Sequence, residues 1–220
     1  MSKQLTTKQP KLYIDYDRTL FDTDKFATAL WGMFSEEAGK SIGDIEEMSK
    51  KAKIDPKFGG FDFDGLVSTL ELKSQTMYTR LDSLLKSENF LIDGADQFIQ
   101  LLLSSGYMPE ILTFGQKGIQ SAKIEVYLDK LTGDRPRTDL ACHITDEPKT
   151  DFIRKQAGSA QGILMDDVAG QELPRGFVEI NFAQNAKLEA VETNKSGFRV
   201  STYPQALKAI RAVLDQLTAP

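Results

Sequence analysis

Short apolar runs bounded by turn residues recur along the chain and predict buried strands. These runs cover residues 11–16, 109–114, 140–144, 162–165 and 176–182. Between and after them, apolar residues at helical spacing predict helices at 95–103, 149–157 and 203–217. Strands that alternate with helices are typical of an α/β fold, so we expect a Rossmann-like parallel sheet sandwiched by helices.

The segment 22–89 interrupts this alternation. It shows no convincing strand pattern and carries two amphipathic helical patterns joined by a glycine-rich stretch at 55–65. The first pattern contains Phe26, Leu30, Met33 and Phe34, and the second contains Leu66, Leu70, Met77, Leu81 and Leu84. Asp64 is the expected N-cap of the second helix. We therefore predict a helical insertion at 22–89 in a core formed by residues 1–21 and 90–220.

Two carboxylates follow the first predicted strand. The strand ends in Asp15-Tyr16-Asp17-Arg18-Thr19, and alternation along an extended chain turns Asp15 and Asp17 toward the same side. One carboxylate could attack phosphorus while the other handles the proton of the leaving group, provided that their pKa values differ. A turn or a helix cap explains an isolated Asp-x-Asp at least as well, so this pair needs support from the rest of the chain.

Three other strand ends carry polar residues, and ligands bind parallel sheets at these ends. Thr113, Phe114 and Gly115 end one strand, where a hydroxyl and backbone N–H groups could hold phosphate oxygens. Lys149 follows the next strand, and its ammonium could neutralise a transferring phosphoryl group. A third strand ends in the adjacent acids Asp166 and Asp167, which repel each other unless a cation compensates. Mg²⁺, which takes oxygen ligands, is the simplest such cation.

These strand ends together resemble the motifs of the haloacid dehalogenase (HAD) superfamily, in its phosphatase branch. The segment Ile14–Asp22 is similar to that family's apolar strand followed by Asp-x-Asp-x-Thr and Leu-Phe-Asp. The resemblance implies that Asp15 is the nucleophile and a Mg²⁺ ligand. It implies that Asp17 is the general acid and base, with its backbone carbonyl on the metal.

The same resemblance gives roles to the other strand ends. It implies that Thr113 binds the substrate phosphate and that Lys149 is the lysine of the third motif. Asp166 and Asp167 correspond to the acidic pair of the fourth motif, and the resemblance favours Asp167 as the direct metal ligand. The insertion at 22–89 resembles a cap that closes over the active site. The expected activity is Mg²⁺-dependent hydrolysis of a small phosphorylated metabolite through an aspartyl-phosphate.

Several alternatives stay open from the sequence. A phosphomutase would carry the same residues, whereas a phospho-acceptor signalling domain fits the order of strands less well. A non-catalytic binding protein is possible, but the retention of all the polar strand ends argues against it. The chain also offers other lysines for the role of Lys149, namely Lys117, Lys123, Lys130 and Lys155. The segment Phe61–Gly65 imitates the nucleophile motif, but it follows no apolar strand and is better explained as a loop with a helix cap.

Composition narrows the function further. The 220 residues carry a net charge of −5, which disfavours broad binding to nucleic acid. No apolar run approaches the roughly 18 residues of a membrane span, and the N-terminus lacks a secretory pattern, so we expect a cytoplasmic protein. The only cysteine, Cys142, and the only histidine, His143, exclude an internal disulfide and a His-rich zinc site. We expect both side chains to be buried in the core.

Overall fold

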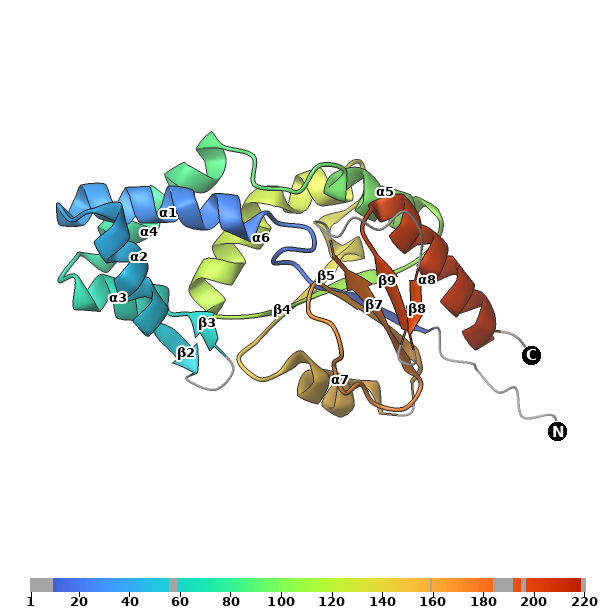
Figure 1. Ribbon diagram of the computed structural model, residues 1–220. Coiled ribbons are helices and arrows are strands. Elements are labelled where there is room, and N and C mark those ends of the chain that lie inside the picture. The colour runs from blue at the N-terminus through green and yellow to red at the C-terminus, as the bar shows by residue number, and fades with distance from the viewer. Residues whose placement is uncertain (1–9, 56–58, 159, 184–191, 195–196, 219–220) are drawn as a thin grey trace.

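The computed structural model describes residues 10–55, 59–158, 160–183, 192–194 and 197–218 (Figure 1). Within these ranges a seven-stranded sheet has the order β5-β4-β1-β6-β7-β9-β8. Its strands are β1 (Lys11–Ile14), β4 (Pro109–Phe114), β5 (Ala141–Thr145), β6 (Gly162–Asp166), β7 (Phe177–Phe182), β8 (Glu192–Asn194) and β9 (Gly197–Val200). Six of them pair in parallel, and β8 pairs antiparallel to β9. The predicted parallel sheet is therefore confirmed, while β8 and β9 were not predicted.

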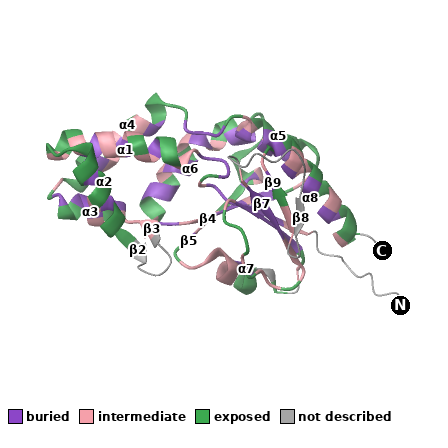
Figure 2. Ribbon diagram, in the orientation of Figure 1, coloured by how far each residue is buried: buried purple, intermediate pink, exposed green. Residues whose placement is uncertain are grey.

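Helices cover both faces of this sheet. The helices α5 (Ala95–Ser104), α6 (Lys117–Thr132) and α8 (Tyr203–Thr218) pack on one face, where Leu12, Ile14 and Ile111 join the larger core. The helix α7 (Lys149–Ala157) covers the other face, where Ile153 packs on Tyr13. The central strands are buried from both sides (Figure 2). This explains why they appear in the sequence as continuous apolar runs rather than as alternating ones.

The insertion lies to one side of the sheet, at the left of Figure 1. It contains α1 (Thr23–Ala38), α2 (Ile42–Lys51), α3 (Phe63–Thr69), α4 (Ser74–Ser87) and a short antiparallel pair, β2 (Lys53–Asp55) and β3 (Gly59–Phe61). The expectation of two helices and no strand was therefore wrong. The glycine-rich stretch contributes to the β2–β3 pair. The first helical pattern lies within α1, α2 was not predicted, and a break near residue 70 divides the second pattern between α3 and α4. Asp62, and not Asp64, caps α3 by accepting a hydrogen bond from the Gly65 N–H (2.9 Å).

Cys142 and His143 differ from the expectation of burial. Strand β5 is an edge of the sheet, so Cys142 is exposed there, although partial burial still raises the pKa of its thiol to about 11. His143 is half-buried, and its Nε2 lies 2.7 Å from Oε2 of Glu110 on the neighbouring strand β4.

Among the described helices, none is long and apolar enough to cross a membrane.

Candidate active site

A tight turn follows β1 and fixes the first carboxylate. The N–H groups of Leu20 and Phe21 both donate to the carbonyl of Tyr16, each at 2.9 Å, and these three side chains are fully buried. Arg18 takes the left-handed conformation (φ 57°) that the reversal requires, which is unusual for a residue other than glycine. The turn is thus anchored by apolar packing, and it holds Asp15 directly at the carboxyl end of the strand.

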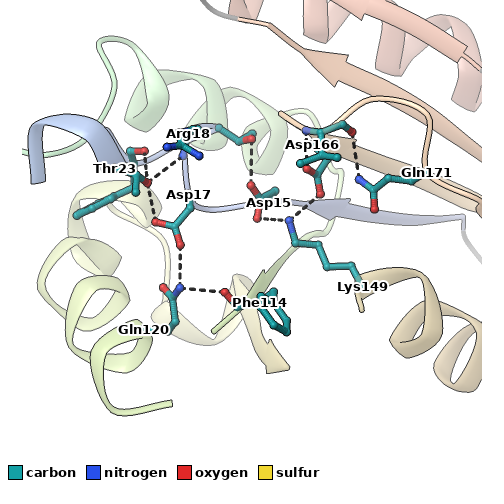
Figure 3. Close-up of polar contacts among 12 residues, drawn as sticks. Asp15, Asp17, Arg18, Thr23, Phe114, Gln120, Lys149, Asp166 and Gln171 are labelled. Carbon is teal, nitrogen blue, oxygen red and sulfur yellow. Dashed lines mark hydrogen bonds and ion pairs between the residues drawn. The ribbon is translucent and has the colours of Figure 1, made fainter. Parts of the chain in front are cut away.

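Lys149 joins Asp15 to Asp166 (Figure 3). Its Nζ lies 2.6 Å from Oδ1 of Asp15 and 2.6 Å from Oδ2 of Asp166, and both carboxylates are buried. Burial raises the pKa of Asp15 to about 8, because the desolvation, together with the smaller effects of the negative charges on Asp166 and Asp17, outweighs the attraction of Lys149. The two carboxylates in turn raise the pKa of Lys149 despite its burial. The ammonium stays charged and compensates only part of the negative charge around it.

Three carboxylates at this end of the sheet converge closely enough to share one cation. One oxygen from each of Asp15, Asp166 and Asp167 lies within 4.8 Å of the others. Burial, followed by the charge of Asp166, raises the pKa of Asp167 to about 6. An all-oxygen donor set with uncompensated negative charge fits a hard dication such as Mg²⁺. The side chain of Asp17 is not part of this cluster.

The carboxylate of Asp17 is instead surrounded by hydrogen-bond donors that lie outside this cluster. Its Oδ1 accepts from the Thr23 hydroxyl (2.7 Å) and is ion-paired with the ammonium of Lys123, while its Oδ2 accepts from the Gln120 amide (2.8 Å; Figure 3). Burial alone would raise the pKa of Asp17, but Lys123 and these hydrogen bonds together lower it. The environments of Asp15 and Asp17 therefore push their pKa values in opposite directions.

Sequence reasoning gave Lys123 and Gln120 no place beside Asp17. Both lie on α6, the helix that follows Thr113, with Gln120 about one turn and Lys123 about two turns into it. Both side chains are buried. Lys123 was considered only as a substitute for Lys149. The sequence held little signal for this, because residues 117–132 show only a weak amphipathic pattern and were not predicted as a helix.

The residues expected to bind phosphate lie at the carboxyl end of β4 and in the first position after it. The Thr113 hydroxyl is buried and has no hydrogen-bond partner among the described residues, as expected of a group that awaits a ligand. The carbonyl of Phe114 accepts from Gln120 (3.1 Å). The N–H of Gly115 donates to the carbonyl of Thr145 (3.0 Å), so it is not free to bind phosphate in this conformation.

Gln116 links the loop after β4 to the insertion. Its Oε1 accepts from the N–H groups of Phe63 (2.9 Å) and Asp64 (3.4 Å) at the start of α3, and its Nε2 donates to the carboxylate of Asp64. The side chain thereby satisfies two N–H groups that the first turn of a helix leaves unpaired. This amide connects the carboxyl end of β4 to the insertion.

The other candidate lysines lie elsewhere. Lys117 is exposed at the start of α6, Lys130 donates to Oδ1 of Asn89, and Lys155 pairs with Glu147 on the surface. Among the five lysines considered, only Lys149 contacts Asp15 in the described part of the chain.

Comparison with known proteins identifies the class of fold. No family model and no curated protein matches the chain. Solved structures do match, and the class that they define is the haloacid dehalogenase-like fold. A haloacid dehalogenase-like hydrolase from Burkholderia xenovorans LB400 has a TM-score of 0.65 at 15% identity and covers 94% of this chain and 99% of its own.

Two further structures agree with this match. A HAD phosphatase from Thermococcus onnurineus has a TM-score of 0.60 at 14% identity, over 90% of this chain and 96% of its own. A magnesium-bound HAD-hydrolase from Bacillus subtilis has a TM-score of 0.53 at 13% identity, over 92% and 99%. The chain therefore has the HAD-like fold that its motifs resemble.

Proposed function

We propose that this protein is a Mg²⁺-dependent phosphatase that hydrolyses a small phosphomonoester through an aspartyl-phosphate on Asp15. The observation that carries the proposal is the convergence of Asp15, Asp166, Asp167 and Lys149 at the carboxyl ends of adjacent strands, beside the unpartnered hydroxyl of Thr113. Structural neighbours described as a HAD phosphatase and as a magnesium-bound HAD-hydrolase support it.

The reaction assigns different tasks to the two carboxylates of the first motif. An oxygen of Asp15 attacks phosphorus, so the bond from phosphorus to the leaving oxygen breaks and an acyl phosphate forms. Asp17 must carry a proton to act as the acid, but its pKa is lowered while it is paired with Lys123 and Gln120. We therefore propose that Asp17 leaves these partners when substrate binds, takes up a proton from solvent and donates it to the leaving oxygen, and then accepts a proton from the water that hydrolyses the acyl phosphate. Lys149 offsets the charge of the phosphoryl group, and the Thr113 hydroxyl donates to one of its oxygens.

Asp15, Asp166 and Asp167 would hold the metal, together with the backbone carbonyl of Asp17. Bound there, Mg²⁺ supplies positive charge that offsets the repulsion between the nucleophile and the phosphate. Asp167 is the proposed direct ligand of the acidic pair, because Asp166 already accepts hydrogen bonds from Lys149 and from the N–H of Val168 (2.9 Å).

We also propose that residues 22–89 act as a cap over this site and that 1–21 and 90–220 form the catalytic core. A cavity of about 460 Å³ supports this division, since it is lined both by the strand ends and by α1 and β3 of the insertion. Closure of a cap excludes water from the reacting groups.

The test is phosphate release from p-nitrophenyl phosphate in Mg²⁺, with EDTA as a comparison. We expect EDTA and Asp15→Asn to abolish release, whereas Asp82→Asn, which changes an exposed carboxylate on α4 outside the metal cluster and the cavity, should retain it. In Asp17→Asn, the good leaving group should still depart but hydrolysis should stall, so mass spectrometry should find the phosphoryl group on Asp15. Full turnover by Asp15→Asn would contradict the proposal. Isomerised sugar phosphates without phosphate release would favour the phosphomutase.

A further inference from the structure

The walls of the cavity above Asp15 are divided by polarity. The floor is polar and consists of the reactive residues at the strand ends. The opposite wall is formed by apolar side chains of the insertion and of α6, namely Phe26, Ala27, Leu30, Trp31, Phe61 and Ile119. A phosphate held on the floor would therefore place its leaving group against this apolar wall.

Two aromatic rings provide the open part of this wall. Phe26, Leu30 and Ile119 are buried, but Trp31 on α1 and Phe61 on β3 are only half-buried. Their rings meet edge to face, with centroids 5.1 Å apart and planes at 76°. Such a pair is a rigid apolar surface, since each ring restricts the rotation of the other. A bound group that covers the two rings would complete their burial.

The cationic groups around the cavity are already paired with carboxylates. Lys123 is paired with Asp17, Lys149 with Asp15 and Asp166, and the amide of Gln116 with the start of α3. Arg18 lies at the exposed side, with 58% of its side chain accessible, and pairs with Asp24. Among the described lining residues, none offers an uncommitted cation to the leaving group. A second phosphate or a carboxylate on the leaving group would enter the cavity without a counter-charge.

We propose that the leaving group of the substrate is an uncharged, largely apolar group that packs on Trp31 and Phe61. This substrate class rests on the proposed phosphatase function and narrows it. It excludes bisphosphates and phosphorylated acids. It places sugar phosphates second, because a largely apolar wall satisfies few of the hydrogen bonds that their hydroxyls would lose on leaving water. Trp31 and Phe61 are then the specificity-determining residues of the site.

The first test measures binding without turnover. Calorimetry in Mg²⁺ compares benzylphosphonate, methylphosphonate and 3-phosphonopropionate, which share the phosphonate and differ in the attached group. We expect benzylphosphonate to bind roughly 10- to 100-fold more tightly than the other two. Trp31 is the only tryptophan, so its fluorescence should change with benzylphosphonate. Equal affinities, or tighter binding of 3-phosphonopropionate, would overturn the proposal.

Variants of the wall sharpen this test. Phe61→Ala and the milder Trp31→Leu should each reduce the preference for benzylphosphonate about tenfold or more, and Trp31→Arg should shift it toward 3-phosphonopropionate. Phe198→Leu is the matched control, because Phe198 is a half-buried aromatic residue on β9 outside the cavity, and it should leave the preference unchanged. Circular dichroism checks that each variant is folded. An unaltered preference in folded Phe61→Ala and Trp31→Leu would refute the assignment of these residues.

The second test separates this proposal from the function on which it rests. Benzyl phosphate and glycerol 3-phosphate both leave through an alkyl oxygen, so their kcat/KM values compare recognition more than reactivity. Faster hydrolysis of benzyl phosphate supports the proposal. Faster hydrolysis of glycerol 3-phosphate would keep the phosphatase and refute the apolar leaving group. No phosphate release from either compound or from p-nitrophenyl phosphate would refute the phosphatase, and the substrate class with it.

Discussion

The ion pair between Lys123 and Asp17 gives a prediction that can be measured without knowledge of the substrate. Only 4% of the Lys123 side chain and 25% of the Asp17 side chain are exposed. The Lys123→Met change removes the ammonium but keeps an apolar stem against the rings of Phe21 and Phe26. It leaves the carboxylate of Asp17 with the hydrogen bonds from Thr23 and Gln120.

The expected cost follows from these surroundings. Removal of one partner from a fully buried ion pair costs about 3–5 kcal/mol. Because a quarter of the Asp17 side chain can reach water, we expect Lys123→Met to lower the free energy of unfolding by about 2–4 kcal/mol at pH 7. Asp17→Asn should cost about 3–5 kcal/mol, since it leaves the less exposed ammonium without its counter-charge. The double variant should recover about 2–4 kcal/mol relative to the sum of the two single changes.

Urea unfolding in metal-free buffer measures the free energy of unfolding of the wild type, the two single variants and the double variant. The pH dependence of these free energies supplies a second check. The pKa of Asp17 is lowered in the folded state, so its stabilisation is present above the ordinary carboxyl value of 3.8 and is lost as the pH falls through the lower folded value. In Lys123→Met, burial without the ammonium raises the pKa of Asp17 above 3.8. The cost of the change should therefore be constant near neutral pH, begin to shrink above pH 3.8 as the variant's Asp17 takes up a proton, and shrink further as the wild-type ion pair is lost at lower pH. Additivity of the single changes within about 0.5 kcal/mol would refute the reasoning.

Three further predictions concern other parts of the molecule. Thr113→Val should not destabilise the protein, because the lost hydroxyl has no partner among the described residues, yet it should weaken inhibition by inorganic phosphate roughly tenfold. Glu110→Gln should cost about 1 kcal/mol at pH 7 in urea unfolding. Hydrogen bonding from His143 helps to lower the Glu110 pKa, so this cost should disappear as the pH falls below about 4, and a pH-independent cost would contradict it. Gly162→Ala should lower the melting temperature by several degrees, because its Cβ would lie 2.4 Å from the Lys11 carbonyl oxygen.

The sequence was most informative where one local signal determined the structure. Apolar runs identified the central strands because these strands are buried on both faces. The polar residues after them were correctly expected together at the carboxyl ends of the strands. The β2–β3 hairpin was missed because its strands are only three residues long and contain two glycines, which give no alternating pattern. Cys142 was misjudged because strand order, which places β5 at the edge, depends on contacts distant in the sequence.

The surroundings of Asp17 show the same limit at the site. Lys123 lies 106 residues from Asp17 in sequence, and Gln120 lies 103 residues away. Lys123 follows Thr113 too closely in sequence for the lysine of the third motif, and this reasoning did not consider a partner for the second carboxylate. Only the direction in which α6 leaves the sheet brings Lys123 and Gln120 to Asp17.

The Gln116 amide makes two parts of the protein thermodynamically linked. If α3 moves away from the sheet, the Phe63 and Asp64 N–H groups lose their acceptor and must find water. Any ligand that shifts the loop at 113–115 therefore changes the free energy of that movement. By reciprocity, any ligand that holds α3 in place changes the affinity of the loop by the same factor. One neutral side chain thus couples what is bound at the strand ends to the position of the helices that cover it.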